Sequence, residues 1–590
     1  MIESQTDGPT DHHASRQQQA ELNQALDPHQ GLKRVVLRFS LWPTGLPPHL
    51  DVLPGSYNTR ERQPLFESEF ECNLFALRQE KLRQISALGQ QTYPSQFVAT
   101  HTLSEVRQKF GNTPAEELES QKTTVTVAGR IMAIRAQGKA GFAQLQQGGE
   151  RLQIYVRLDA VGEQGFQLYK LLDLGDHIGV SGYVFRTRTG ELTIHVDKIT
   201  FLAKAMLALP EKYHGLADVE LRYRQRYVDL FMNTDVRAVF VKRAQILKAI
   251  RSFFDQRGFI EVETPMMQPI AGGAAARPFR THHNALDLSL YLRIAPELYL
   301  KRLVVGGLDR VYEINRNFRN EGVSTQHNPE FTMLEFYQAY ANYHDLMQLT
   351  QELIIHVARE VNGSTVTHFD GHEIDLSLWR RFSMREAILE FWPEKAGPKP
   401  SLEDFGSEHS VEQLAERLRE AHISLDYKPG QPAGKTIAGI FEAVAEEHLI
   451  QPTIIYDFPV AVSPLSKNKP DEPDWVERFE FYIGGFELGN AFSELNDPVE
   501  QRNRFEQQLA ERERGDTEAH AMDEDYVRAL AYGLPPTGGE GIGIDRLTMV
   551  LTGARSIRDV ILFPLLRSQT GPEANGETTA SSPRLEESGQ

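Results

Sequence analysis

The sequence predicts an α+β protein made of a small β-barrel and a larger domain in which strands and helices are mixed. Two observations support this prediction. Short alternating apolar and polar runs fill the segment from about 123 to 207, whereas strand-like and helix-like patterns are interspersed from about 226 to 567. A chain of 590 residues also needs more than one core, because single cores stop growing near about 250 to 300 residues.

The composition is typical of a globular protein, with 40% hydrophobic and 24% charged residues. The net charge of −18 argues against a broad basic surface, so any contact with nucleic acid must be local. A single cysteine, Cys72, excludes a disulfide framework and a multi-cysteine zinc site. No stretch approaches the roughly 20 apolar residues that span a bilayer, and no secretory signal is evident. We therefore expect a cytoplasmic protein with no membrane partner.

Both ends of the chain are expected to be disordered. Residues 1–66 are rich in Gln, His, Asp and Pro without a sustained period, and residues 568–590 form a polar tail. From Phe70, apolar residues recur at helical spacing and stop near Gly89, which predicts an amphipathic helix. Together with the barrel that follows, this helix forms a predicted domain at 67–208.

Glycine-rich turns separate the strands of the predicted barrel. Five strands are expected to begin near Thr124, Phe142, Leu152, His177 and Glu191, with a helical piece around 166–172. Short strands in this number favour a closed barrel of the OB type. Such barrels bind single-stranded nucleic acid on one strand face. A linker is expected at 209–225, before a domain at 226–567.

The larger domain contains several predicted helices. Residues 241–257 have helical spacing, and Pro296 stands where another helix begins, with Glu297 in its first turn. Residues 380–450 have mainly helical patterns, with a Pro/Gly-rich interruption near 428–434.

A strand, a loop and a returning strand are predicted between Asn315 and Tyr340. Strict alternation places Phe331, Glu335 and Tyr337 on one face of the returning strand, together with Met333. A carboxylate among aromatic rings on a core-facing side is costly unless a cation pairs with it. The segment therefore predicts either a cation-binding site or a buried structural ion pair.

A hairpin is predicted around Gly484 and Gly485, which lie between two apolar runs. Pairing across this turn places Tyr482 opposite Glu487, so that Glu480 and Glu487 share a face as diagonal neighbours. Two carboxylates there would repel each other unless a hard cation such as Mg²⁺ bridged them to substrate phosphates. A solvent-facing acidic pair is the alternative.

The segment from Gly538 to Leu551 runs from a glycine-rich strand into a helix, with Arg546 in the first turn of that helix. Its spacing does not match a dinucleotide-binding fingerprint. A cation at a helix start is unfavourable to the helix dipole, so an arginine there usually faces an anion from elsewhere. A plain tight turn is the alternative.

Together these three segments resemble the signature motifs of the class II aminoacyl-tRNA synthetases, with residues 258–265 similar to the dimer-interface motif. Four further segments, 272–279, 292–303, 318–322 and 490–497, resemble the bacterial lysyl-tRNA synthetases. The likeness extends over about residues 68–567. It implies a catalytic domain built on an antiparallel sheet with flanking helices, a homodimer, and the substrates ATP, L-lysine and tRNA(Lys).

The resemblance implies an ATP site with a bound magnesium ion. Arg319 would hold the α-phosphate and the lysine carboxylate, which suits a bidentate guanidinium. The other implied contacts are Glu321 and Asn328 at the adenine end, His327 at the phosphates, Phe331 and Arg546 on the two faces of the base, and Glu480 and Glu487 on Mg²⁺. Catalysis would rest on positioning and charge stabilisation by Arg319, Mg²⁺ and Arg546.

The resemblance also implies a lysine pocket with acids at two places about one lysine length apart. Gly273, Glu297 and Glu335 would receive the α-ammonium, Tyr337 and Glu494 the side-chain ammonium, and Asn490 and Phe492 would flank the aliphatic stem. A pocket for aspartate would need a cation at its far end, and the sequence offers no obvious one there.

In the barrel, the resemblance implies anticodon contacts at Arg135, Phe142, Gln153 and Glu191. A stacking ring with flanking polar side chains is how unpaired bases are recognised. The alternative for Phe142 is a place in the barrel core.

Three departures from the family pattern are visible. Gln326 stands where related sequences often place an arginine near the pyrophosphate, and Phe486 replaces a residue that is often polar. Strict alternation places Glu494 on the opposite face from Glu487, so both serve one site only if a bulge lies between them, with Gly489 the obvious candidate.

Three other functions remain open at this point. An aspartyl- or asparaginyl-tRNA synthetase shares the barrel and the three motifs but should lack the set Glu335, Tyr337 and Glu494. A catalytically silent tRNA-binding paralogue is disfavoured because Arg319, Glu480, Glu487 and Arg546 are all present. A lysyl-transferase that modifies a protein is disfavoured because that shorter relative lacks the barrel.

Overall fold

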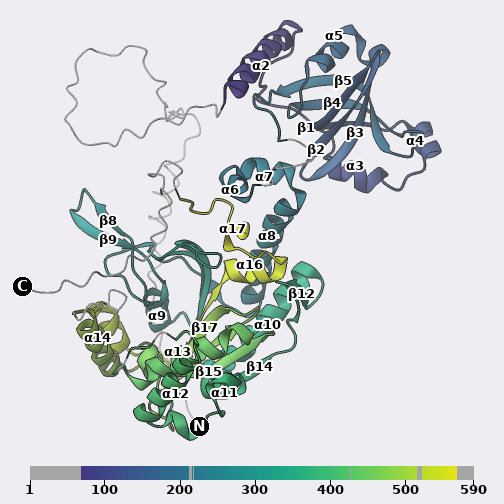
Figure 1. Cartoon of the computed structure of the whole chain (residues 1–590). Coiled ribbons are helices and arrows are strands. Elements are labelled where there is room, and N and C mark those ends of the chain that lie inside the picture. Colours follow the sequence, from purple (N-terminus) through teal and green to yellow (C-terminus); the bar gives the residue numbers. More distant parts are fainter. Residues whose placement is uncertain are drawn as a thin grey trace, which may run out of the picture. The chain divides into compact units, whose positions relative to one another are not determined.

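The structure is a computed structural model that describes residues 68–210, 216, 218–425, 427–428, 430–513 and 521–567. The segments predicted to be disordered, 1–66 and 568–590, lie outside the described residues. Figure 1 shows the helices and strands in chain order.

A closed five-stranded barrel confirms the predicted OB-type fold. Its strands pair in the order β1-β2-β3-β5-β4. They span Thr124–Gln137 (β1), Ala140–Gln147 (β2), Glu150–Arg157 (β3), His177–Arg186 (β4) and Leu192–Ala203 (β5). The predicted helical piece belongs to a longer helix, α5 (Leu158–Leu171), which is kinked at Gly162. Apolar side chains that alternate along the strands fill the barrel interior.

The amphipathic helix predicted before the barrel is α2 (Glu69–Ala87). Ser68 caps its start by accepting a hydrogen bond from the Glu71 backbone amide at 3.2 Å. The helix ends at Leu88, and Gly89 follows with a φ of 78° that favours glycine. Two short helices, α3 (Leu103–Phe110) and α4 (Ala115–Gln121), lie between α2 and the barrel in the sequence.

An eight-stranded sheet forms the centre of the larger domain, in the order β14-β15-β16-β17-β18-β11-β10-β6. Its strands span Arg380–Ser383 (β14), Thr453–Pro459 (β15), Trp475–Tyr482 (β16), Glu487–Ser493 (β17), Thr537–Gly543 (β18), Glu330–Ala339 (β11), Arg310–Phe318 (β10) and Ile260–Glu261 (β6). All neighbours are antiparallel except β14 with β15 and β6 with β10. The antiparallel sheet with flanking helices therefore confirms the expected α+β class.

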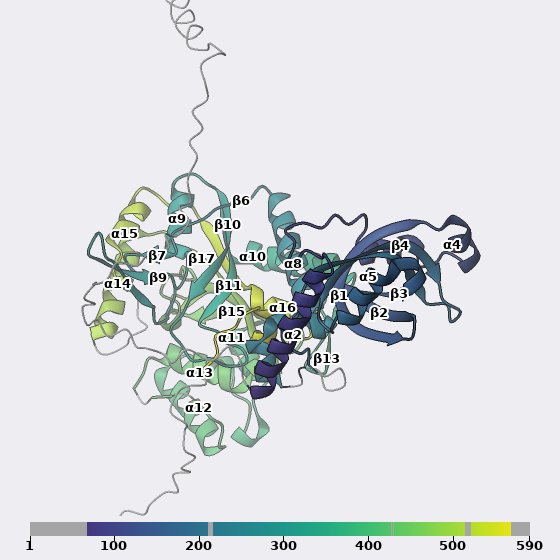
Figure 2. The same ribbon diagram turned by 90° about the horizontal axis from the view of Figure 1, so that it is seen from above.

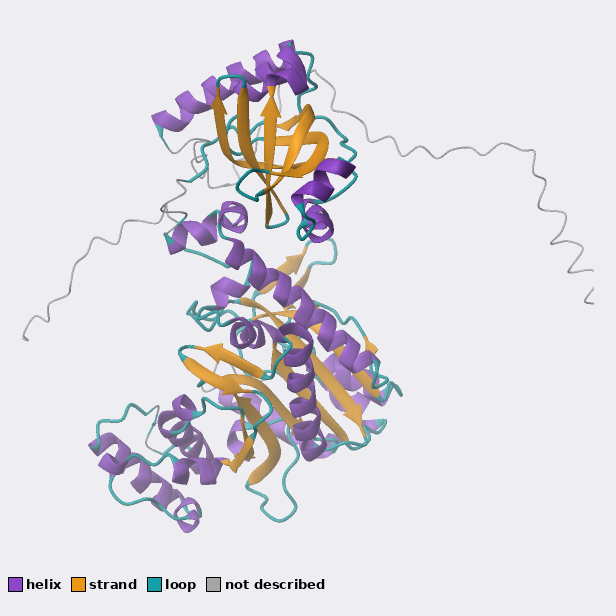
Figure 3. Ribbon diagram, turned by 90° about the vertical axis from the view of Figure 1, so that its right-hand side faces the viewer, coloured by secondary structure: helices purple, strands orange, loops and turns teal. Residues whose placement is uncertain are grey.

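Three helices pack on one face of this sheet: α8 (Thr234–Asp255), α10 (Tyr343–Asn362) and α16 (Ile544–Thr552). Figure 3 shows the long helices running across the strands. Helix α8 begins before the predicted start at Val241. The sheet residues that meet these helices include Leu334 and Phe336 of β11, whereas Glu335 and Tyr337 point to the other face. That second face carries the cavity described below.

Smaller elements complete the larger domain. Two helices, α6 (Val219–Arg224) and α7 (Arg226–Met232), precede α8. The predicted helical region contains α11 (Met384–Glu390), α12 (Glu408–Glu420) and α13 (Ala433–Val444) around a separate apolar core (Figure 2). The remaining elements are β7 (Met267–Gln268), β8 (Arg280–His283), β9 (Leu288–Leu292), α9 (Glu297–Val305), β12 (Val366–Phe369), β13 (His372–Asp375), α14 (Pro498–Glu513), α15 (Glu524–Ala531) and α17 (Ile557–Val560), with 3₁₀ turns at Glu394–Ala396, Leu402–Phe405, Glu446–His448 and Val460–Val462.

Phe254 of α8 lies within the apolar layer between this helix and the sheet. Its fully buried ring lies 4.9 Å from the ring of Phe259, 5.0 Å from that of Tyr312 and 4.8 Å from that of Phe336, measured between centroids. We expect Phe254→Ala to lower the free energy of unfolding by about 3 to 5 kcal/mol, because it leaves a cavity among these rings. Chemical denaturation followed by circular dichroism measures this loss.

The matched control is Phe70→Ala, which removes a ring that is 68% exposed. This control should change the free energy of unfolding by less than about 0.5 kcal/mol. Equal losses in the two variants would contradict the packing described here.

Candidate functional site

A cavity of about 430 Å³ opens on the sheet face opposite α8 and α10. Strands β11, β16, β17 and β18 contribute to its wall, together with the start of α9, the loop after β10 and the start of α16. Fourteen of the predicted site residues line it: Gly273, Glu297, Arg319, Glu321, His327, Asn328, Phe331, Glu335, Tyr337, Glu480, Glu487, Asn490, Phe492 and Arg546. The structure therefore brings segments that are far apart in the sequence to one site.

Arg319 follows the end of β10 and supplies a positive charge to the cavity. Its guanidinium lies 5.2 Å above the ring centroid of Phe331, a favourable cation–π distance. Its Nε is buried without a hydrogen-bond partner among the described residues. Burial lowers the pKa of this guanidinium from its usual value. A half-buried cation in this state favours an anionic ligand.

Glu335 supplies a buried carboxyl group to the same cavity. The Tyr337 hydroxyl donates to its Oε1 at 2.8 Å. Within the described part of the chain, no lysine, arginine or histidine forms an ion pair with Glu335. Burial, with Glu297 nearby, raises its pKa to about 8. The structural ion pair considered for this residue is therefore absent from the described residues, and the carboxyl group stays available for a cationic ligand.

Glu297 lies in the first turn of α9, and its carboxylate is bonded to a lysine of the same helix. The Nζ of Lys301 donates to Glu297 Oε1 at 2.6 Å and also forms an ion pair with Glu494. Lys301 itself does not line the cavity, so its charge is not offered there directly. Sequence reasoning missed Lys301 because an acid and a lysine four residues apart are typical of an exposed helix surface.

Glu494 does not line the cavity. It lies just after β17 and is 1% exposed. An added Cβ on Gly539 would lie 2.1 Å from its Oε1 and 2.3 Å from the Tyr337 ring. The carboxylate is thus packed against the glycine backbone of β18, directly beside a cavity-lining strand.

The hairpin of β16 and β17 places Glu480 and Glu487 on the cavity wall. Tyr482 is opposite Glu487 as predicted, but the register then shifts so that Phe481 is opposite Gly489. Leu488 is therefore the extra residue of a bulge just before Gly489, which confirms the bulge expected between Glu487 and Glu494. The simple diagonal pairing of the two acids was wrong in detail, because Glu480 is opposite Asn490.

Glu480 is held by two donors. Arg478 Nη2 and the Tyr482 hydroxyl each lie 2.5 Å from one of its oxygens. Burial, partly offset by Arg478 and reinforced by Glu487, raises the pKa of Glu480 to about 7. Its side chain is 13% exposed, so the alternative of a solvent-facing acidic pair is wrong.

Arg546 faces the hairpin, as expected for a cation at a helix start. Its Nη1 donates to the Glu487 backbone carbonyl at 2.6 Å and lies 3.5 Å from the Glu487 carboxylate. Its Nη2 lies 3.2 Å from His327 Nε2. Burial, together with Arg546, lowers the pKa of His327, which favours the neutral imidazole at pH 7. Gln326 also lines the cavity beside them.

Arg478 is a cavity residue that sequence reasoning missed. It donates to Glu480, to Asn490 Oδ1 at 3.1 Å and to the Val462 carbonyl at 2.7 Å. Strand alternation contained the signal, because residues 478 and 480 share a face. The arginine fixes two predicted site residues relative to each other.

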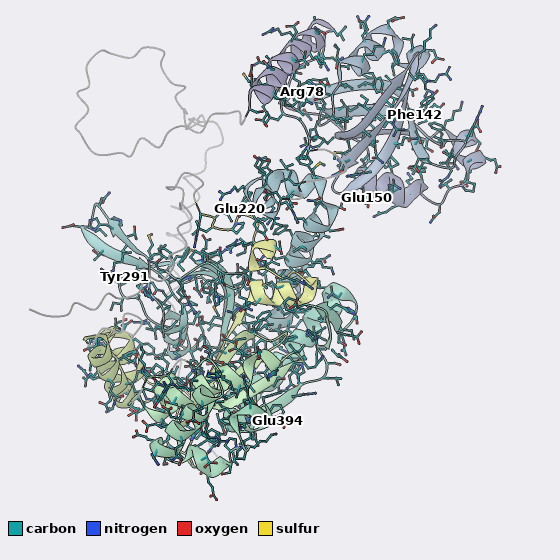
Figure 4. The ribbon with its side chains drawn as sticks, in the orientation of Figure 1. Arg78, Phe142, Glu150, Glu220, Tyr291 and Glu394 are labelled. Atoms are coloured by element: carbon teal, nitrogen blue, oxygen red, sulfur yellow. The ribbon has the colours of Figure 1, made fainter. Side chains whose placement is uncertain are left out.

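The four residues predicted to contact an anticodon lie on the barrel. Phe142 of β2, which is labelled in Figure 4, is 39% exposed, so its alternative place in the barrel core is wrong. Its ring stacks on that of Tyr155 with centroids 4.6 Å apart. Arg135 pairs with Phe142 across β1 and β2, and Gln153 donates to the Thr193 hydroxyl at 3.0 Å. Glu191 is exposed just before β5. A flat ring with polar neighbours thus faces outward.

Two kinds of feature are absent from the described residues. No described helix has the length and hydropathy that a bilayer crossing requires. No cluster of three or more His, Cys, Asp or Glu side chains with metal-binding geometry occurs in the parts of the chain that the structure describes.

Comparison with known proteins agrees with the two-part architecture. Residues 218–567 match the family model of class II tRNA synthetases (D, K and N), and residues 125–202 match the OB-fold nucleic acid binding domain. A lysine–tRNA ligase of Moorella thermoacetica is 55% identical over 502 residues, which cover 85% of this chain and 99% of that protein. Lysine–tRNA ligases of Halalkalibacterium halodurans and Pelotomaculum thermopropionicum are 52% and 54% identical, with 85% and 84% of this chain and 98% and 95% of those proteins covered.

The raised pKa of Glu335 predicts how stability depends on pH. Between about pH 4.5 and pH 8, the folded protein keeps a proton on Glu335 that the unfolded chain releases, so wild-type stability falls with rising pH. Glu335→Gln carries no such proton. We expect this variant to become more stable than the wild type by up to a few kcal/mol as pH rises to about 8, with no further gain above it.

Urea unfolding at several pH values measures this difference. The control is Glu394→Gln, which alters an exposed glutamate (Figure 4) and should show no such pH trend. A pH-independent difference between Glu335→Gln and the wild type would contradict a buried, protonated Glu335.

Proposed function

The chain belongs to the lysine–tRNA ligase family of the class II tRNA synthetases, and from this premise we propose that it joins L-lysine to tRNA(Lys) using ATP. The single observation that carries the proposal is the charge layout of the cavity. Arg319, which has no ion-pair partner among the described residues, supplies a cation, and Glu335, equally without one, supplies an acid. This layout suits a ligand with an anionic group near the first and an ammonium near the second.

Lysine would lie along the wall formed by β11 and β17. Its α-ammonium would be received by Gly273, Glu297 and Glu335. Its side-chain ammonium would lie toward Tyr337 and Glu494, and its aliphatic stem would pass between Asn490 and Phe492. Oε1 of Glu494 occupies the space that a Cβ on Gly539 would fill, on the same side as the Tyr337 ring, so both side chains would face the ammonium.

ATP would bind at the opposite end of the cavity. Arg319 would hold the α-phosphate and the lysine carboxylate together, and His327 would contact the other phosphates. Adenine would lie between Phe331 and Arg546, with Glu321 and Asn328 at its edge. The glutamine at position 326 would offer an amide to the pyrophosphate instead of a charge.

Glu480 and Glu487 would hold Mg²⁺ on the phosphates. Two carboxylates, without a third ligand residue, fit Mg²⁺, which retains waters and takes its remaining oxygens from phosphates. Burial raises the pKa of Glu480, and a bound cation would favour its ionised form. The bound ion would neutralise phosphate charge during the reaction.

The reaction would proceed in two steps. First, the lysine carboxylate attacks the α-phosphorus of ATP in line, which forms lysyl-adenylate and releases pyrophosphate. Then a terminal ribose hydroxyl of tRNA attacks the carbonyl carbon, which forms the ester and releases AMP. Neither step needs a protein nucleophile. Arg319 and Arg546 would align the reacting groups and stabilise the charge on the phosphorus.

The barrel would bind the anticodon of tRNA(Lys). Phe142 would stack on a base, with Arg135, Gln153 and Glu191 reading its edges or neighbours. Membership of the family supports a homodimer and a cytoplasmic location as parts of this proposal.

ATP–pyrophosphate exchange with single amino acids tests the proposed substrate. We expect exchange with L-lysine and background rates with L-aspartate and L-asparagine. The buried acids would repel the acidic side chain of aspartate, and the neutral amide of asparagine would not balance their charge. Exchange driven by aspartate or asparagine would favour the related synthetases instead. No exchange with any amino acid would favour a non-catalytic tRNA-binding protein.

Substitution of Phe142 separates the two domains. We expect Phe142→Ala to lower kcat/KM for tRNA(Lys) charging by about 5- to 100-fold, since base–aromatic stacking contributes about 1 to 3 kcal/mol per base. Lysine-dependent exchange should stay at the wild-type rate, because Phe142 does not line the cavity. Phe142→Tyr keeps a ring and should restore charging. Normal charging by Phe142→Ala would remove Phe142 from the tRNA contact.

A further inference from the structure

Lys301 occupies an unusual position on α9. Its side chain is 0% exposed, and its ammonium forms ion pairs with Glu297 and Glu494. The same ammonium lies 5.4 Å from the ring centroid of Phe492. Three of the residues proposed for the lysine subsite therefore surround one internal lysine.

Lys301 offsets part of the acid charge of this region. Three buried acids, Glu297, Glu335 and Glu494, would carry a formal charge of −3 if all were ionised, and burial raises the pKa of each. Burial alone would lower the pKa of Lys301, but Glu297 and Glu494 outweigh it and raise that pKa well above its usual range. With Lys301 counted, these four side chains have a formal charge of −2 if all three acids are ionised, so Lys301 offsets one of the three acid charges.

Each paired carboxylate meets Lys301 through one oxygen. Lys301 takes Oε1 of Glu297 and Oε2 of Glu494. Glu297 also lines the cavity, and Oε1 of Glu494 lies against Gly539 beside Tyr337. Lys301 itself does not line the cavity. Its ammonium therefore fixes the orientation of both acids from outside the cavity lining.

We propose that Lys301 is a positioning residue of the amino-acid subsite, which holds Glu297 and Glu494 in place and offsets part of their charge. This inference rests on the proposed function. Lys301 would not touch the substrate and would act through the two acids.

Variants of Lys301 test the inference in the ATP–pyrophosphate exchange assay. We expect Lys301→Met to raise KM for lysine by about 10- to 100-fold, because the two acids lose a charged hydrogen-bond donor. KM for ATP should change less than about threefold, since no proposed ATP contact pairs with Lys301. Lys301→Gln keeps a hydrogen-bond donor but not the charge. If Lys301→Met does not fold, Lys301→Gln should still fold and show the raised KM for lysine.

The chain offers a matched control in Lys204 of the barrel. Its side chain is also 0% exposed and also bridges two acids, Asp173 at 2.6 Å and Asp176 at 2.7 Å. Lys204→Met removes an equivalent buried bridge far from the cavity in sequence. This variant should keep the wild-type KM for lysine, whatever it does to the melting temperature.

A double-mutant cycle with Glu494→Gln shows whether Lys301 acts through the acid. If it does, the double variant Lys301→Met/Glu494→Gln should bind lysine much better than the product of the two single effects implies. Effects that multiply to within about twofold would overturn the inference. So would a wild-type KM for lysine in both Lys301→Met and Lys301→Gln.

The proposed function and the role of Lys301 can be disproved separately. Absence of lysine-dependent exchange in the wild-type protein removes the proposed function. Normal exchange in the wild type, with unchanged KM for lysine in the Lys301 variants, removes only the role of Lys301.

Discussion

Burial of carboxyl groups along the central sheet is the constraint on which the site depends. A buried acid must be paired, hydrogen-bonded or protonated, because its charged form is poorly solvated. Glu540 shows the protonated solution on the core face: the Thr350 hydroxyl donates to its carboxyl group at 2.8 Å, and burial raises its pKa well above the usual range. Glu297 and Glu494 show the paired solution through Lys301. Among the described residues no cation forms an ion pair with Glu335, so the ammonium group of a ligand would favour loss of the proton from its carboxyl group.

Glycine and a bulge make room for these acids. Strand β18 contributes Gly539 and Gly541 to the cavity, and added Cβ atoms there would collide with Glu494, Tyr337 or Met333. The bulge at Leu488 turns the later part of β17, so that Glu487 and Asn490 both line the cavity although they are three residues apart. Backbone features of two strands therefore decide which side chains meet.

Local periodicity explains what the sequence could predict. Alternation along β11 placed Glu335 and Tyr337 on one face, and the paired glycines 484 and 485 located the hairpin, because both signals lie within a few residues. Whether a helix residue is buried against the sheet depends on contacts with segments that are distant in the sequence. Lys301 forms an ordinary acid–lysine pair at a spacing of four residues, and only packing of α9 among distant segments such as α15 and the end of β17 buries it. The same limit hid the exact register shift at Leu488, although the need for a bulge was visible.

Lys301 also bears on how one fold can serve amino acids of opposite charge. An acidic amino acid needs a cation at the far end of its pocket, and the family model that this chain matches covers synthetases designated D, K and N. In this chain Lys301 does not line the cavity, and Glu297 and Glu494 both pair with it. In the proposed pocket, selectivity for an ammonium would rest on an excess of acids over this cation, which is a property of the whole cluster and not of any single residue.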